Sequence, residues 1–140
     1  MTPAHWKLTF SPSVTIRELQ QEFQKRYHWL KIEFYSIPHS ISDKKVSKNM
    51  FSSGKSLQEI GYRLPSVTIE IDDKMSVKEL EEIIHKKTGL YAQVFRKSGK
   101  IWLETSATDN WTLGEQNEEA EALQKQLKQE RENPEDHDIW

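Results

Sequence analysis

The chain has 140 residues, of which 35% are hydrophobic and 30% charged, and its formal net charge is −2. This length fits one ordinary domain. The chain has no cysteine, which excludes disulfides, thiolate zinc sites and cysteine nucleophiles. It shows no signal-peptide pattern and no run of the roughly 20 apolar residues that cross a bilayer. We therefore expect a cytoplasmic protein that contacts no membrane.

Charge is distributed unevenly along the chain. Residues 1–110 carry 17 Lys and Arg against 13 Asp and Glu, whereas residues 111–140 carry 3 against 9. The first part is therefore net +4 and the second net −6. Such an asymmetry bears on the choice of partners and not on the fold.

The sequence repeats itself at an offset of 61 residues. Residues 16–19, Ile-Arg-Glu-Leu, align with residues 77–80, Val-Lys-Glu-Leu, and Phe34 aligns with Phe95. After a loop that is five residues longer in the first copy, residues 56–59 align with residues 112–115. Two copies are too few for a solenoid. We predict one domain, residues 1–110, built from two repeats at about 6–61 and 67–117.

Each repeat is predicted to begin with a strand and a helix. Residues 6–10 and 67–71 alternate apolar and polar side chains, which is typical of half-buried strands. The helices that follow begin after Thr15 and Ser76, and each has a glutamate three residues later, as in a capping box. Gly89 is predicted to end the second helix.

A second strand is predicted after each helix, at residues 30–35 and 91–96. In the second repeat, residues 97–100 form a tight turn into a third strand at residues 101–105. The corresponding hairpin of the first repeat, around residues 45–48, has a weaker pattern.

The C-terminal part is predicted to be a helix over residues 111–133. Its residues are strong helix formers, and Leu113, Ala120, Leu123 and Leu127 make a thin apolar stripe. This stripe fits docking on the chain's own domain or pairing with a second copy. Residues 134–140 are predicted to be a disordered acidic tail.

The order of elements predicts an α+β fold. Two successive β-α-β units suit one ferredoxin-like sandwich with both helices on one antiparallel sheet, extended by a hairpin strand and the C-terminal helix. The alternative is a β-grasp fold. Its evidence is the second repeat, in which a strand, a capped helix, a glycine hairpin and Thr112-Leu113-Gly114-Glu115 resemble the order of elements in ubiquitin-like modules.

Catalytic chemistry has little support in the residue pattern. The five histidines form no metal-ligand spacing with one another, and we expect no cofactor, no metal and no catalytic residue. Residues 36–55 contain several serines with His39 and Asp43, but a catalytic triad is recognised by geometry. Because long loops are often functional or mobile, an enzyme that works from this loop is the third and least favoured hypothesis.

Basic residues lie beside aromatic ones in two places, and this pattern suits single-stranded nucleic acids. The candidate contacts are Lys44, Lys45, Lys48, Arg96, Lys97, Lys100 and Trp102. We favour the other interpretation, in which Phe95 and Trp102 face the core while the charges solvate a hairpin.

A protein partner is the first hypothesis. The candidate contacts are Trp111, Leu123, Leu127 and Trp140, since aromatic and aliphatic anchors dominate binding energy where they become buried. We expect a non-enzymatic interaction or adaptor module that is a monomer or a weak homodimer. The second hypothesis is a nucleic-acid-associated protein whose acidic C-terminal tail masks its basic body.

Overall fold

The computed structural model describes residues 5–37 and 49–132. Its strands are β1 (His5–Phe10), β2 (Leu30–Tyr35), β3 (Val67–Asp72), β4 (Tyr91–Ser98) and β5 (Ile101–Glu104). Its α-helices are α1 (Ile16–Arg26), α2 (Val77–Thr88) and α3 (Leu113–Glu132), and two short 3₁₀ helices are η3 (Gln58–Ile60) and η4 (Ser106–Thr108). The predicted α+β class is confirmed, with two antiparallel sheets and three α-helices.

Equivalent strands of the two repeats pair with each other. β1 pairs with β3, and β2 pairs with β4, which also carries β5 on its other side. Both shared pairs are antiparallel, and in the first of them Leu8 lies opposite its repeat equivalent Ile69. The two repeats are therefore related by a pseudo-twofold axis, as the subunits of an intertwined dimer would be.

This pairing does not confirm the ferredoxin-like arrangement. The two strands of each β-α-β unit lie in different sheets, and the β-grasp alternative fares no better because β3 is not in the sheet of β4 and β5. The physical reason is visible at the edges of the β2–β4 pair. Gln20 of α1 donates its Nε2 to the carbonyl of Ile32 at 2.9 Å, and Glu81 of α2 accepts the N–H of Val94 at 3.0 Å. Helix side chains therefore bond to the outward backbone groups at two positions of this pair, Ile32 on the free edge of β2 and Val94 on the β5 side, beyond the last β4–β5 pair.

The repeat extends to a capped turn that closes each copy. Ser56 and Glu59 form one capping box, and Thr112 and Glu115 form the other. These hydrogen bonds lower the pKa of both glutamates. The backbone around each turn is bonded in the same way, since Leu57 N–H donates to Val14 and Leu113 N–H donates to Met75. The second capped turn continues into α3, so α3 begins as part of the second repeat.

The predicted helix signals act as expected at three ends. Thr15 and Ser76 form complete capping boxes at the starts of α1 and α2. Gly89 caps α2 with a left-handed φ of 80°, a conformation that suits glycine. Their apolar stripes face one continuous core, formed by residues of all three α-helices and of β1 to β4: Leu8, Phe10, Ile16, Leu19, Phe23, Leu30, Ile32, Phe34, Ile69, Ile71, Val77, Leu80, Ile84, Ala92, Val94 and Leu113.

A polar network joins the two repeats at the start of α2. Arg26 forms an ion pair with Asp73 at 2.8 Å, and the hydroxyl of Tyr27 donates to the same carboxylate at 2.8 Å. Burial raises the pKa of Tyr27 far above its ordinary value, so this hydroxyl keeps its proton. Trp6 Nε1 in turn donates to the Tyr27 hydroxyl. The end of α1 is thereby fixed to the second repeat.

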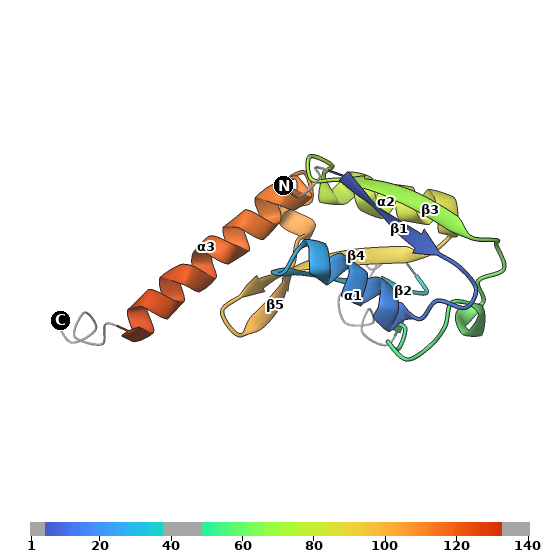
Figure 1. Ribbon diagram of the computed structural model, residues 1–140, viewed down its shortest axis with the longest axis horizontal. Coiled ribbons are helices and arrows are strands. Elements are labelled where there is room, and N and C mark those ends of the chain that lie inside the picture. Colours follow the sequence, from blue (N-terminus) through green and yellow to red (C-terminus); the bar gives the residue numbers. More distant parts are fainter. Residues whose placement is uncertain (1–4, 38–48, 133–140) are drawn as a thin grey trace.

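The β4–β5 hairpin and α3 extend together from one end of the molecule. Figure 1 shows α3 running outward above the hairpin, away from α1, α2 and the β1–β3 pair. Within the described ranges, no helix is both long and apolar enough to span a bilayer.

Candidate functional site

The N-terminal half of α3 is fixed to the body by a buried glutamine. Gln116 is fully buried, and its Oε1 accepts a hydrogen bond from Arg96 at 2.7 Å. Its Nε2 donates to the carbonyl and the hydroxyl of Thr108 at 2.8 and 2.9 Å. A buried amide with all these partners defines one orientation of the helix. Leu113 and Ala120 are buried on the same side of α3.

The C-terminal half of α3 contacts the tip of the hairpin. Gly99, at the turn between β4 and β5, accepts a hydrogen bond from Gln124 at 3.0 Å. A Cβ atom placed on Gly99 would lie 3.8 Å from Cδ1 of Leu127, so this leucine is next to the turn. Leu123 and Leu127 are both half-buried. The predicted partner residues on α3 therefore dock on their own domain without being fully covered.

Two aliphatic side chains of β5 are exposed next to this contact. Ile101 is 58% exposed and Leu103 is 38% exposed. Leu103 lies opposite Arg96, which reaches α3 through Gln116, so these side chains are on the α3 side of the sheet. We call Ile101, Leu103, Leu123 and Leu127 the hairpin–helix surface. Its β5 members were not among the predicted contacts, because the local sequence does not show that β5 is the last strand of its sheet.

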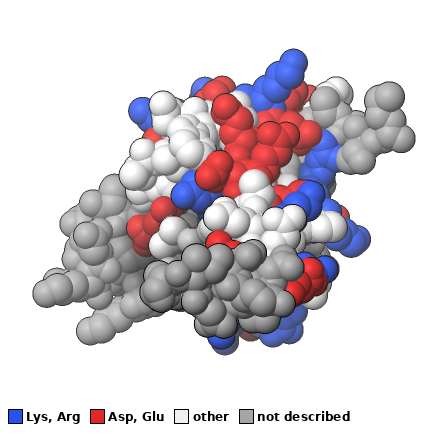
Figure 2. All heavy atoms as spheres, turned by 90° about the vertical axis from the view of Figure 1, so that its left-hand side faces the viewer, with Lys and Arg blue, Asp and Glu red and all other residues white. Residues whose placement is uncertain are grey.

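Acidic side chains gather near the start of α3. Trp111, Glu115, Glu118 and Glu119 line a shallow hollow of about 310 Å³ near the start of the helix. Figure 2 views the molecule from the free end of α3 and shows Asp and Glu side chains gathered in one patch, with Lys and Arg around it. Predicted contact Trp111 is half-buried and lies under the guanidinium of Arg96, at 5.5 Å from its ring centroid. Predicted contact Trp140 is outside the described residues.

The opposite face of the same sheet carries a basic and aromatic cluster. The Nζ of Lys31 lies 5.3 Å from the ring centroid of Phe95 and 5.2 Å from that of Trp102. The Nζ of Lys97 lies 5.0 Å from the Trp102 ring. Both rings are half-buried, and neither belongs to the core. The expectation that Phe95 and Trp102 face the core is therefore wrong, because the β4–β5 register places them on the outer face.

The predicted nucleic-acid contacts separate into three groups. Lys97 and Trp102 lie together on the outer face, and Lys100 is exposed at the hairpin turn. Arg96 is on the other face, bound to Gln116. Lys44, Lys45 and Lys48 are outside the described residues. Lys31 was missed, although the alternation of residues 30–35 places it opposite the core-facing side chains.

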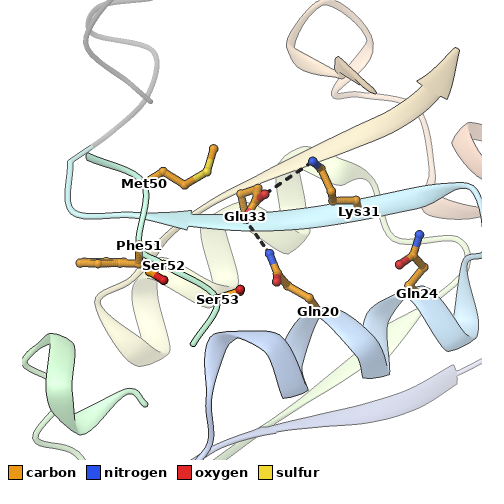
Figure 3. A pocket seen from close by; sticks show the side chains of 8 residues that line it. All are labelled: Gln20, Gln24, Lys31, Glu33, Met50, Phe51, Ser52 and Ser53. Atoms are coloured by element: carbon orange, nitrogen blue, oxygen red, sulfur yellow. Dashed lines mark hydrogen bonds and ion pairs between the residues drawn. The ribbon is translucent and has the colours of Figure 1, made fainter. Parts of the chain in front are cut away.

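A polar hollow of about 440 Å³ lies between α1, β2 and residues 50–53 (Figure 3). Glu33 accepts a hydrogen bond from Gln20 at 2.6 Å and forms an ion pair with Lys31 at 3.5 Å. These groups bond to one another, and the hydroxyl of Ser53, which also lines the hollow, accepts from Arg17 at 3.4 Å. The predicted loop residues His39 and Asp43 are outside the described residues.

The described histidines and carboxylates form no cluster of three that fits a metal ion. The ring of His85 stacks on Tyr91 with centroids 4.2 Å apart. The most perturbed carboxyl is Glu81, whose pKa is raised to about 8. Burial is the main cause, the nearby Asp109 and Glu104 add to it, and the hydrogen bond from Val94 opposes it. Its role is to cover a strand edge.

Comparison with known proteins adds no relative. No family model matches this chain, and neither a curated protein nor a solved structure matches it.

Proposed function

We propose that this chain is a non-enzymatic protein-interaction module that binds a partner protein through the hairpin–helix surface. The observation that carries the proposal is the exposure of Ile101 and Leu103 beside the half-buried Leu123 and Leu127. Apolar side chains that gather at the surface within a polar rim mark interaction sites. Aliphatic anchors of this kind contribute most where a partner covers them fully.

The rim indicates the chemistry of the partner. Glu119 of α3 is exposed one helical turn before Leu123, so it places negative charge beside the surface. A partner that presents an apolar segment flanked by Lys or Arg complements both features. The rim charges are expected to affect the rate of association and its salt dependence more than the final affinity.

The test is a quantitative affinity capture with three forms of the full chain. The double variant Ile101→Lys, Leu103→Lys places charge on the surface, and Leu64→Lys changes another exposed hydrophobic residue (42% exposed) far along the chain, before β3. We expect a set of proteins that is retained by wild type and by the Leu64 variant and lost with the double variant. Identical capture by all three folded forms would contradict the proposal.

A nucleic-acid-associated protein is the second candidate, and the cluster of Lys31, Lys97, Phe95 and Trp102 favours it. Aromatic rings next to ammonium groups suit stacked bases with their phosphates. The ion pair of Lys31 with Glu33 weakens this reading, because it neutralises part of the positive charge.

The second candidate is tested by titrating single-stranded DNA and RNA while following tryptophan fluorescence. The full chain is compared with residues 1–132, which lack Glu135, Asp136 and Asp138 of the predicted masking tail but keep α3. Salt-sensitive binding that strengthens on truncation and disappears in Trp102→Ala supports this candidate. Absence of binding by both forms at low salt rejects it.

A further inference from the structure

β5 has a free backbone edge. It pairs with β4 on one side, from Phe95 opposite Glu104 to Ser98 opposite Ile101. The two-residue turn makes Ser98 and Ile101 the hydrogen-bonded pair, so the alternation of an antiparallel ladder turns the N–H and C=O of Trp102 away from β4. Within residues 5–37 and 49–132, no other group of the chain bonds to them. An uncovered edge is a template for another strand.

The residues of this edge are complementary to themselves. In an antiparallel pair of two β5 strands centred on Trp102, Ile101 lies opposite Leu103 of the second copy, and Lys100, the turn residue just before β5, lies opposite its Glu104. Both charged residues are exposed and form no ion pair within the described ranges. Opposite charges and aliphatic side chains across a strand pair each stabilise the pair. In this register the outward N–H of Trp102 in each copy donates to the outward C=O of Trp102 in the other copy.

We propose that the partner at the β5 edge is a second copy of this chain, in an antiparallel register centred on Trp102. The two three-stranded sheets then join into one six-stranded sheet across a twofold axis, which is a closed, isologous interface. The exposed Ile101 and Leu103 of both copies form one aliphatic patch next to the two α3 helices. This inference rests on the proposed function in treating β5 as a contact surface, and it names the occupant of the strand edge.

A register centred on the neighbouring Leu103 loses both complementary pairs. A centre on Leu103 places Trp102 opposite Glu104. Leu103 and Arg96 form a hydrogen-bonded pair, so the N–H and C=O of Leu103 point toward β4 and cannot bond to a second copy. A four-residue strand pair is smaller than a standard interface. We therefore expect a weak dimer with a dissociation constant on the order of 100 µM.

The test is the mass of the full chain by sedimentation equilibrium, from well below to well above that concentration. Wild type is expected to rise from 16.5 kDa toward twice that mass. Lys100→Glu places like charges opposite each other twice, as does Glu104→Lys, and each should weaken the dimer about tenfold. The double variant with both changes should regain the wild-type constant, and an equimolar mixture of the two single variants should form a mixed dimer.

Two results would overturn the inference. One is a wild-type mass of 16.5 kDa at every concentration. The other is unchanged association in both single variants, which would place any dimer on another surface. Since Lys100→Glu and Glu104→Lys leave Ile101 and Leu103 in place, loss of self-association leaves the capture of a different partner intact. The failure of this inference and the failure of the proposed function are therefore distinguishable.

Discussion

Glu81 and Gln20 occupy equivalent positions in the two repeats and serve the same purpose with different chemistry. Gln20 donates to the carbonyl of Ile32, and Glu81 accepts from the N–H of Val94, the residue opposite Ile32 in the β2–β4 pair. The neutral amide suits its buried position, whereas the carboxylate must be desolvated, and this raises the pKa of Glu81 to about 8.

The raised pKa of Glu81 predicts a pH-dependent stability. The folded chain holds this proton more tightly than the unfolded chain, whose glutamate pKa is about 4.3. The stabilisation is therefore fully present below that value and is lost as pH rises to about 8. In Glu81→Gln, which keeps an acceptor for Val94, we expect stability at pH 9 to exceed that of wild type by on the order of 1–2 kcal/mol.

The measurement is urea unfolding of both forms at acidic, neutral and alkaline pH, compared as a difference so that other titrating groups cancel. If wild type and Glu81→Gln show parallel pH profiles, Glu81 is not the buried proton-binding group described here.

At the scale of elements, α3 is both a part of the domain and an extension from it. Leu113 is in the core and Gln116 is fully buried, whereas Gln124 and Leu127, further along the helix, contact the hairpin turn at Gly99. α3 therefore begins with buried side chains in the domain and ends as an extension on its surface.

This division predicts different results for two truncations. Residues 1–132 should unfold within about 0.5 kcal/mol of the full chain, because this form keeps all of α3 with its buried Leu113, Gln116 and Ala120. Residues 1–110 lack Leu113, Gln116 and Ala120 and leave Arg96 and Thr108 without their buried partner. We expect a loss of at least about 3 kcal/mol for this form. Equal stability of the two truncated forms, measured by denaturant unfolding, would show that α3 does not belong to the folded unit.

The elements that were predicted correctly depend on local chemistry. The capping boxes after Thr15 and Ser76, the glycine at the end of α2 and the turn before β5 each involve residues within a few positions of one another. The sheet partners join residues about sixty positions apart, and the apolar alternation of a strand is the same whichever neighbour it takes. For this reason the sequence predicted the strands of the ferredoxin-like arrangement but not their pairing.

The same distinction applies to the candidate site. Trp102 and Lys97 were found because they are close in sequence, whereas Lys31 joins them only through the β2–β4 pairing. Arg96 was misplaced because its face depends on which side of the sheet α3 covers. Exposure of Ile101 and Leu103 follows from β5 being the last strand of its sheet, which no local pattern reveals.

For the whole molecule, pairing of equivalent strands makes each repeat depend on the other. Neither sheet forms within one repeat except for the β4–β5 hairpin. The connection between the repeats is exposed at residues 63–66. A cut between Pro65 and Ser66 therefore removes no buried side chain and keeps the hydrogen bond of Tyr62 to the Pro65 carbonyl.

Fragments 1–65 and 66–140 are expected to be unfolded separately and to fold when mixed in equal amounts. The reason is that each fragment alone exposes the apolar faces of two strands whose partners are in the other fragment. Circular dichroism and amide-resolved NMR spectra of the separate and mixed fragments measure this. A native-like spectrum of either fragment alone would contradict the pseudo-twofold arrangement.

The proposed function rests on contact at the hairpin–helix surface, and site-specific photo-cross-linking tests it most directly. A photoreactive side chain is placed at Leu103 in one form of the full chain and at the equally exposed Leu64 in another. We predict cross-linked products with a partner protein from position 103 and none from position 64. Equal products from both positions, or products from position 64 only, would show that the exposed β5 and α3 side chains are not the contact surface.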